Sequence, residues 1–460
     1  MSLSFDALRP LVEGLPPIVM LSSLDGPGAG DGALRLHRGL LAAGADATTY
    51  VLRKTVLNNS VIEIDDSMKR RNIYAVMTHA VFRHYPHRPL CFELFSLDKS
   101  PVDLASIDGV QNAKLVHLHW IAGMVSFPQA GAIFKEKAVV WSLTDMNPLS
   151  GGCHYAAGCE KYITTGCQAC PQLGPSVSCT DLAAQNFTAR QVGYAKINMA
   201  VVAHSKWLTE CSKKSKLLSS FPHATIPTCV DPWVFFPQPR SWARATFGIP
   251  HERKAILFGV AGIQRKNKGL HIIKPTLEKL RSQWKGKLPL LIIFGGDARE
   301  FIPEGYECLE LGRVAPNVLA KAYSAADVYI SLSFQDNMPN TVKEALSCGT
   351  PVICFDKFGS EDIVSDGITG FTVSHPGLPL AADGRLLQHP PYSIPHKTVA
   401  ELAEKIVHAL AIPHEESKNL RIRCSQKASE YFSPVLRTAK FLTIYRKILG
   451  LPHVAIDGCT

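Results

Sequence analysis

The chain has 460 residues, of which 46% are hydrophobic and 19% are charged. This composition is typical of a globular protein and excludes a disordered or fibrous chain. The length exceeds the size at which one hydrophobic core usually stops growing, so we expect two domains.

The sequence contains no run of about 18 apolar residues, so it predicts no transmembrane helix. An early Asp6 and the lack of a continuous apolar stretch argue against a secretory signal, and we expect a cytoplasmic protein. The net charge of +10 is dispersed in small basic clusters, which are either solvated faces or a peripheral contact with an anionic membrane surface. We expect no nucleic-acid partner, because no recognition module accompanies the charge.

The N-terminal residues follow a β-loop-α-β pattern. Its parts are a strand at 17–21, a glycine-rich loop at 22–32 that contains Gly28 and Gly30, a helix at 33–41 and a strand at 47–52. Glycines at a helix N-terminus let a ligand approach the backbone. No acidic residue follows at the spacing of a dinucleotide fingerprint, and a loop that only turns the chain is the alternative.

Residues 53–112 show no clear periodicity, whereas residues 115–121 and 138–143 are predicted strands. Strands that alternate with helical stretches favour a parallel, doubly wound sheet. His119 lies in the first of these strands, where a histidine is either a satisfied core residue or a pH-sensitive catalytic group.

Four of the thirteen cysteines are clustered, and they are Cys153, Cys159, Cys167 and Cys170. Four soft ligands suffice for a closed, structural zinc site; disulfides and free thiols are the alternatives. The odd total, and cysteines such as Cys354 within apolar runs, fit a reducing compartment.

A proline-rich, aromatic stretch at 226–237 is a predicted linker, and we expect the domain boundary near Asp231. A strand at 255–261 then precedes a basic loop with Arg265 and Lys268. Two cations before a helix suit a diphosphate, although such loops are often only solvated.

Residues 327–355 are predicted to form a strand, a polar turn, a helix and a second strand. Asn340 and Thr341 are expected caps of the helix, and Glu344 is expected in its first turn. Asp336 in the turn and Glu344 in the helix can hold sugar or ribose hydroxyls. Alternatively, Glu344 complements the helix dipole and Asp336 is a solvated loop residue.

The spacing from Asp336 to Glu344-Ala345, followed by Cys-Gly-Thr-Pro-Val at 348–352, resembles the donor-site signature of retaining GT-B glycosyltransferases. The similar family is the large sugar-nucleotide-dependent group, glycosyltransferase family 4-like. Its first signature position is usually Glu, so Asp336 is a shortened variant. The resemblance implies two doubly wound α/β, Rossmann-like domains that face a central cleft.

The resemblance also implies a role for each donor-site residue. Asp336 would contact the transferred sugar, Glu344 the ribose, and Arg265 with Lys268 the diphosphate of a UDP- or GDP-sugar. The other implied donor-site residues are Gly269, Arg313, Asn337, Met338, Pro339, Asn340, Thr341, Gly28 and Gly30. No cofactor would be required for catalysis.

The segments 117–120 and 141–154 resemble the bacterial exopolysaccharide, or colanic-acid-type, branch of this family. Relatives have a histidine where this chain has Thr144, which shifts the catalytic role to Asp145 or His119. A cysteine-rich insertion like residues 151–180 also occurs in this branch.

We therefore expect an N-terminal acceptor-side domain at 1–230, a donor domain at 231–430 and a C-terminal helix at 431–460 that packs back on the first domain. The expected activity is a retaining transfer of a sugar to a glycan or lipid-linked saccharide in polysaccharide biosynthesis. The alternatives are a nucleotide-sugar epimerase or hydrolase, and a catalytically impaired sugar-nucleotide- or glycan-binding protein.

Overall fold

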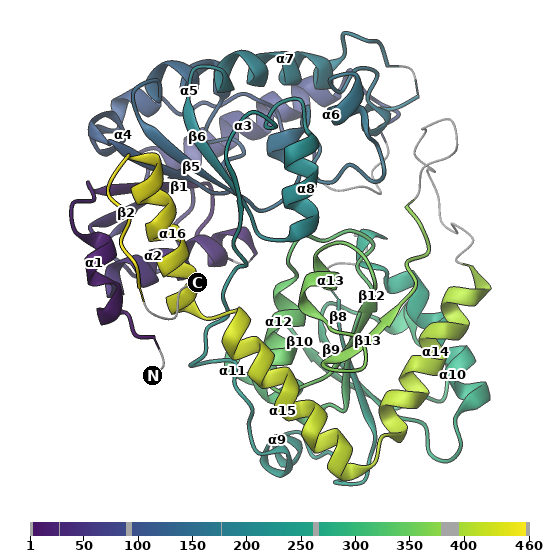
Figure 1. Ribbon diagram of the computed structural model, residues 1–460. Helices are drawn as coiled ribbons and strands as arrows, with labels where there is room; N and C mark the ends of the chain where they lie inside the picture. Colours follow the sequence, from purple (N-terminus) through teal and green to yellow (C-terminus); the bar gives the residue numbers. More distant parts are fainter. Residues whose placement is uncertain are drawn as a thin grey trace. The chain divides into compact units, whose positions relative to one another are not determined.

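The computed structural model describes residues 3–26, 28–88, 94–175, 177–260, 266–378 and 395–456. These residues form two compact units (Figure 1). The first unit contains the described residues of 1–229 and 434–460, and the second contains those of 230–378 and 395–433. No helix among the described residues is long and apolar enough to cross a membrane.

The first unit is built on a parallel seven-stranded sheet in the order β3-β2-β1-β4-β5-β6-β7. The strands are β1 (Ile18–Ser22), β2 (Ala47–Val51), β3 (Val61–Glu63), β4 (Leu115–Leu118), β5 (Ala138–Leu143), β6 (Asn198–Ala203) and β7 (His223–Thr225). The helices are α1 (Arg9–Val12), α2 (Ala29–Ala42), α3 (Ser67–Phe82), α4 (Asp108–Asn112), α5 (Phe127–Ile133), α6 (Lys161–Thr164), α7 (Leu182–Tyr194), α8 (Lys206–Lys214) and α16 (Pro434–Ile448).

The central strands of this sheet, β1, β4 and β5, are buried along their whole length. Their sequences are mostly apolar and do not alternate, as expected for a parallel sheet that helices cover on both faces; His117 in β4 and Ser142 in β5 are the buried polar exceptions within these two strands. All strands of this sheet pair in parallel, so their carboxyl ends lie at the same edge of the sheet. Such an order is built from β-α-β connections, which are normally right-handed.

The C-terminal helix α16 packs against α2 in the first unit (Figure 1). The two helices approach closely at Gly39, where an added Cβ atom would lie 2.1 Å from Thr438 Oγ1. The hydroxyl of Tyr445 in α16 lies 2.6 Å from Nδ1 of His117, which is a residue of β4. A buried apolar cluster that includes Leu36, Leu40 and Phe441 surrounds this contact.

The second unit has a parallel six-stranded sheet in the order β10-β9-β8-β11-β12-β13. The strands are β8 (Ala255–Val260), β9 (Leu290–Gly295), β10 (Cys308–Gly312), β11 (Val328–Ser331), β12 (Val352–Phe355) and β13 (Gly370–Val373). The helices are α9 (Arg240–Thr246), α10 (Ile273–Gln283), α11 (Pro316–Ala325), α12 (Asn340–Ser347), α13 (Gly359–Ile363), α14 (His396–Ala411) and α15 (His414–Tyr431).

The predicted strands at 138–143 and 352–355 have the same bounds in the structure. The strand predicted at 115–121 is wrong at its end, because β4 stops at Leu118 and His119 begins a turn. Helix α2 begins at Ala29, four residues before the predicted start, and so takes Gly30 into its first turn. Helix α3 was not predicted, and none of its residues is buried.

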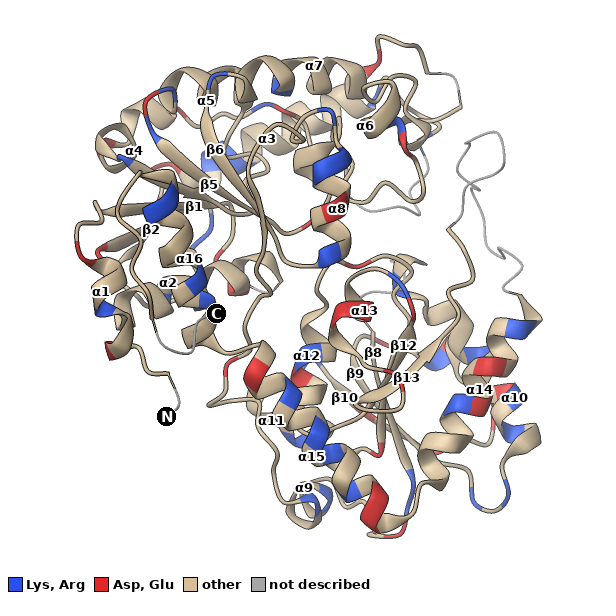
Figure 2. Ribbon diagram, in the orientation of Figure 1, with Lys and Arg blue, Asp and Glu red and all other residues tan. Residues whose placement is uncertain are grey.

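Charged side chains of both signs are interspersed on the helices of each unit. Figure 2 shows Lys and Arg next to Asp and Glu along α8, α14 and α15. The excess positive charge is therefore not collected on these helices, which agrees with the dispersed basic clusters of the sequence.

Candidate active site

The second unit has a topological switch point between β8 and β11. From β8 the chain continues to β9 on one side, whereas β11 and β12 lie on the other side. Ligands of open α/β sheets bind outside the carboxyl ends of strands at such a point. The segments that follow these two strands are residues 261–269 and 332–339, and both carry predicted site residues.

Lys268 and Asp336 connect these two segments. Lys268 Nζ lies 2.6 Å from Asp336 Oδ2, and the side chains are 24% and 15% exposed. The ion pair is therefore partly accessible to solvent. Arg265, the other predicted cation, lies outside the described residues.

Gly269 allows the two segments to approach closely. Its φ is +72°, and a Cβ atom there would lie 2.0 Å from the carbonyl oxygen of Leu332. The neighbouring Asn267 carbonyl accepts a hydrogen bond of 2.7 Å from the amide of Phe334. Any side chain at position 269 would clash with backbone and separate Lys268 from Asp336.

The loop that carries Asp336 is held from its other side by α13 and by the segment after β13. The Gly359 amide donates to the Asp336 carbonyl at 2.9 Å, and a Cβ at Gly359 would collide with Asn337. His375 Nε2 lies 2.8 Å from the carbonyl oxygen of Phe334. Burial lowers the pKa of His375, which favours the neutral ring.

Helix α12 follows directly, and its partly buried amino end begins at the end of this loop, where the first N–H groups of a helix have no partner within the helix. Its N-cap is Pro339 without a side-chain hydrogen bond, so the prediction that Asn340 and Thr341 cap the helix is wrong. Both residues lie in the first turn instead, because proline tolerates the position where no N–H is needed.

The prediction that Glu344 lies in the first turn of α12 is wrong, because the structure has it in the second turn. Glu344 is 7% exposed, and the hydroxyl of Tyr323 donates to its Oε2 at 3.5 Å. Burial and the nearby Glu344 carboxylate raise the pKa of Tyr323, so the phenol stays protonated and remains a donor.

The other predicted donor-site residues differ in exposure. Asn337 and Met338 are buried in the loop, Pro339 is buried at the start of α12, and Arg313 is exposed directly after the edge strand β10. Asn337 contributes its carbonyl to the close contact at Gly359. Lys268, Gly269, Asp336 and the start of α12 are thus adjacent, while Arg313 is at the far strand of the sheet.

The sheet of the first unit also has a switch point, between β1 and β4. Ser23, which begins the glycine-rich loop, donates from its amide to the Trp120 carbonyl at 2.7 Å. Gly28 has φ +91° and is the N-cap of α2, and a Cβ at Gly30 would lie 2.7 Å from the Leu24 carbonyl oxygen. The glycine-rich loop and the His119-Trp120 segment therefore meet at one edge.

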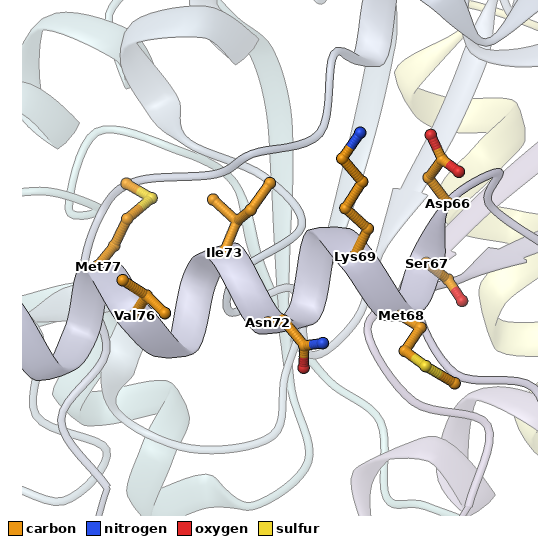
Figure 3. A pocket seen from close by; sticks show the side chains of 8 residues that line it. All are labelled: Asp66, Ser67, Met68, Lys69, Asn72, Ile73, Val76 and Met77. Carbon is orange, nitrogen blue, oxygen red and sulfur yellow. The ribbon is translucent and has the colours of Figure 1, made fainter.

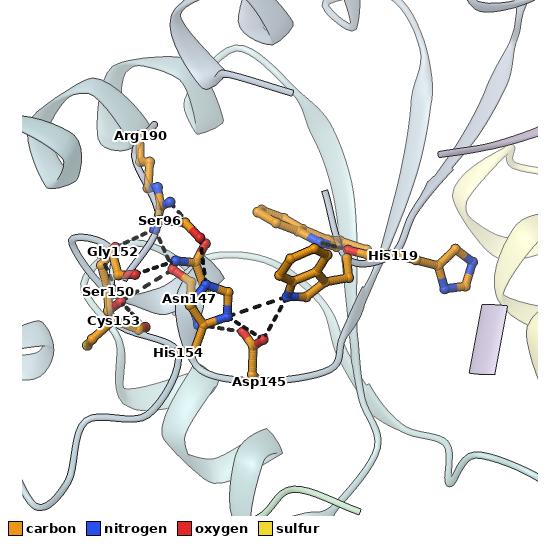
Figure 4. Close-up of polar contacts among 11 residues, drawn as sticks. Ser96, His119, Asp145, Asn147, Ser150, Gly152, Cys153, His154 and Arg190 are labelled. Carbon is orange, nitrogen blue, oxygen red and sulfur yellow. Dashed lines mark hydrogen bonds and ion pairs between the residues drawn. The ribbon is translucent and has the colours of Figure 1, made fainter. Parts of the chain in front are cut away.

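Asp145 lies after β5 in a buried polar network (Figure 4). Its Oδ2 is 2.6 Å from His154 Nδ1 and accepts a hydrogen bond of 3.1 Å from Trp120 Nε1. The amide of Asn147 donates to Oδ1 at 2.9 Å. The other ring nitrogen of His154 lies 2.7 Å from Ser96 Oγ. Asp145 is therefore held by three partners.

His119 does not join this network, and Figure 4 shows its ring directed away from Asp145. It stacks on His117 with ring centroids 4.1 Å apart, and it is 2% exposed. Burial, with His117 and Arg437 nearby, holds the pKa of His119 well below its usual range, so the ring is neutral.

The four clustered cysteines line one small cavity beside α6. Three of them are buried and Cys159 is partly buried, and all four are free thiols. Among the described residues, no three Cys, His, Asp or Glu side chains are grouped closely enough to hold a metal ion as they stand.

Several residues of these sites were missed in the sequence. Asp25 in the glycine-rich loop accepts hydrogen bonds from the amides of Thr55 and Val56 at 2.6 and 3.0 Å. Ser96 and His375 come from segments without periodicity or a recognisable motif. Asp25 follows a predicted strand, so its place in the loop at the strand's carboxyl end could have indicated it. No signal in the sequence marks Ser96 or His375.

Residues 254–411 match the family model described as "Glycosyl transferases group 1". A D-inositol 3-phosphate glycosyltransferase of Kineococcus radiotolerans is 29% identical over 160 residues, which are 32% of this chain and 37% of that protein. The corresponding protein of Jonesia denitrificans is 25% identical over 385 residues, 77% of this chain and 82% of that protein. The match to an uncharacterized glycosyltransferase of Methanocaldococcus jannaschii covers 39% of that protein.

Solved structures resemble the whole chain. Sucrose-phosphate synthase from Thermosynechococcus elongatus has a TM-score of 0.62 at 16% identity, covering 94% of this chain and 99% of its own. Anabaena HepE in complex with UDP has a TM-score of 0.58 at 14% identity, and the match covers 95% of this chain and 100% of the HepE chain. The chain therefore has the two-domain α/β fold of GT-B glycosyltransferases. The family match itself is confined to residues 254–411, whose described part lies in the second unit.

Proposed function

We propose that this protein is a glycosyltransferase that binds a nucleotide-sugar donor at the switch point of its second unit. The observation that carries the proposal is the Lys268–Asp336 pair beside the amino end of α12. A cation, a carboxylate and the N–H groups of a helix start, at the carboxyl ends of parallel strands, match the phosphates and hydroxyls of a sugar nucleotide.

Lys268 and the backbone N–H groups of α12 bind the donor diphosphate in this proposal. Charge-assisted hydrogen bonds to phosphate are stronger than neutral ones, and they strengthen further as charge develops on the leaving group. Arg265 adds a second cation from the same segment. These groups take the role that a metal ion has in other transfer reactions, so we expect transfer without added metal.

Asp336 contacts the transferred sugar, and Glu344 binds a ribose hydroxyl. The hydrogen bond from Tyr323 to Oε2 orients the Glu344 carboxylate for this role. The signature spacing supports transfer with retention at the anomeric carbon. Hydrogen bonds between the base and the backbone near Arg313 complete donor binding.

We infer that the donor is a UDP-sugar in preference to a GDP-sugar. HepE, which has the same fold, is described in complex with UDP and with UDP-glucose.

We infer that the first unit binds the acceptor, a glycan or lipid-linked saccharide of polysaccharide biosynthesis. The loop with Gly28 and Gly30 meets the His119-Trp120 segment at the switch point of this unit. The Asp145 network fixes the indole of Trp120, and an indole face is a good platform for a sugar ring.

Helix α3 supports a peripheral contact with an anionic membrane surface, where a lipid-linked acceptor would be found. Met68, Ile73 and Val76 are 68%, 41% and 68% exposed on this helix. They border an open hollow of about 710 Å³ that Lys69 also lines (Figure 3). Apolar side chains next to a lysine are suited to an anionic bilayer surface.

The proposed activity is tested by incubating the purified chain with UDP-glucose or GDP-mannose, each with and without an acceptor. The acceptors are an octyl glycoside and D-inositol 3-phosphate, and the products are followed by NMR. We expect transfer from the UDP-sugar with the α configuration of the donor kept in the product. Release of free sugar at the same rate without an acceptor would show a hydrolase instead.

A further inference from the structure

The cavity beside α6 has a volume of about 20 Å³ and is lined by Cys153, Cys159, Cys167 and Cys170. A buried space needs about 10–15 Å³ to hold one water molecule, so this cavity has room for a single small ligand or ion. Four thiols around such a space are unusual packing, because one or two apolar side chains would fill it as well.

The backbone near these cysteines adopts several left-handed conformations. Three of the five described non-glycine residues with positive φ lie here, namely Ala157, Cys167 and Ala169. Each such residue costs on the order of 1 kcal/mol, and such strain persists only where the surroundings fix it. The amide of Gly151 also donates to Cys167 Sγ at 3.2 Å, a contact that a thiolate accepts better than a thiol.

Burial raises the pKa of all four thiols, and two cations near the cavity oppose this in part. The charged residue that lines the cavity is Lys161, whose Nζ donates to the Ala169 carbonyl at 2.6 Å. Among the described lining residues there is no carboxylate. Arg190 is nearby and binds the carbonyl of Ser150 at 2.7 Å. A site of four thiolates and one divalent cation has a net charge of −2, which these two cations offset in part.

We propose that Cys153, Cys159, Cys167 and Cys170 bind one structural zinc ion. Each thiol releases its proton to solvent as its sulfur forms a bond to zinc, so four protons leave for one Zn²⁺ bound. Soft thiolates select zinc, and four protein ligands leave no open position for catalysis. As they stand, no three of the four side chains are grouped closely enough to hold a metal ion, so zinc binding requires the sulfur atoms to move closer together.

The zinc site holds the loop that carries His154. Cys153 directly precedes His154, and His154 lies 2.6 Å from Asp145. The ion therefore fixes the position of Asp145 and Trp120 without contact to a substrate. The His154 ring itself is directed to Asp145 and Ser96 and is not a fifth ligand.

The test is the zinc content of the full chain, purified with reductant and without chelator and measured by plasma mass spectrometry. We expect about one zinc ion per chain for the wild type. Cys170→Ser should lose at least 80% of it, because a neutral hydroxyl replaces a thiolate. Cys179→Ser is the matched control, since Cys179 is exposed and does not line the cavity, and it should keep the zinc.

A second measurement does not depend on the folding of a variant. Titration of the native wild type with p-hydroxymercuribenzoate should release the zinc, which a chromogenic chelator detects. A wild type that contains no zinc, both as purified and after dialysis against zinc sulfate with reductant, would overturn the proposal. So would full zinc retention in a folded Cys170→Ser chain.

Discussion

Lys268 Nζ lies 2.6 Å from Asp336 Oδ2, so the segments that follow β8 and β11 are joined at the switch point of their sheet. The pair has two consequences. It holds the ammonium group at the loop that leads into α12, and it neutralises a carboxylate next to the proposed site for an anion. When a diphosphate binds, Lys268 gains a further partner, and Asp336 becomes available to a sugar hydroxyl.

Gly269→Ala should weaken donor binding strongly while the unit remains folded. The new methyl group would lie 2.0 Å from the Leu332 carbonyl oxygen, so the backbone must move and Lys268 moves with it. Gly286→Ala is the control, because Gly286 also has a positive φ, +95°, but no atom within 4 Å of the added Cβ. We expect roughly 100-fold weaker UDP binding by calorimetry for the first variant only. Equal binding by both variants would show that the close contact does not position the site.

Asp336→Asn should reduce turnover more than donor affinity. The amide keeps the shape of the side chain but loses the charge that orients Lys268 and the sugar. We expect kcat to fall by roughly 100-fold, with a smaller change in KM. Glu278→Gln, an exposed position on α10, makes the same chemical change away from the site and should leave both constants unaltered. An unchanged kcat for Asp336→Asn would remove this carboxylate from the mechanism.

Asp327→Asn should destabilise the second unit. Asp327 accepts from Arg240 at 2.6 Å and from Arg244 at 3.0 Å, and its side chain is 8% exposed. Removal of the charge leaves the buried Arg244 without its anionic partner, which costs on the order of 3 kcal/mol. Urea unfolding measures the loss of free energy, and Asp297→Asn, an exposed position, should change it by less than about 0.5 kcal/mol.

The stability of the first unit should fall on acidification. Burial, followed by the charge of Arg38, lowers the pKa of His37 from 6.5 to about 4, and His37 is 0% exposed. Above pH 6.5 the ring is neutral in both states. Between pH 6.5 and 4 the unfolded chain binds a proton that the folded chain does not, so stability falls by up to about 3 kcal/mol.

Two other buried histidines change the pH dependence in the same direction. Burial holds the pKa values of His117 and His119 well below 6.5. The His37 contribution is isolated by His37→Gln, whose unfolding free energy should depend less on pH in this window. Identical pH slopes for the variant and the wild type would contradict the assigned cause.

The sequence was sufficient to predict the regular parts of the fold, because buried parallel strands such as β5 and β12 are mostly apolar and do not alternate. Helix α3 was not predicted, because none of its residues is fully buried; Tyr74, Met77 and Val81 pack against the core only as partly buried side chains. The helical turn that contains Glu344 was predicted wrongly, because the N-cap of α12 is Pro339 and not a polar residue.

The candidate site was predictable only where its residues lie in one motif or follow predicted strands. Lys268 and Asp336 met these conditions, although the distance between them could not be known. The network of Ser96, His154 and Asp145 could not be predicted in this way, because it joins three separate loops that meet only when the sheet has folded. Its members are ordinary polar loop residues until the structure brings them together.

The most direct test of the proposed donor site is calorimetric titration of the wild type, Lys268→Ala and Lys274→Ala with UDP. Lys274 is exposed on α10 and controls for the loss of one positive charge. We expect the wild type and Lys274→Ala to bind UDP with the same affinity, and Lys268→Ala to bind at least 10-fold more weakly, as loss of a charge-assisted hydrogen bond of about 1.5–3 kcal/mol requires. Equal UDP affinity of all three proteins, or no binding by the wild type, would contradict the account.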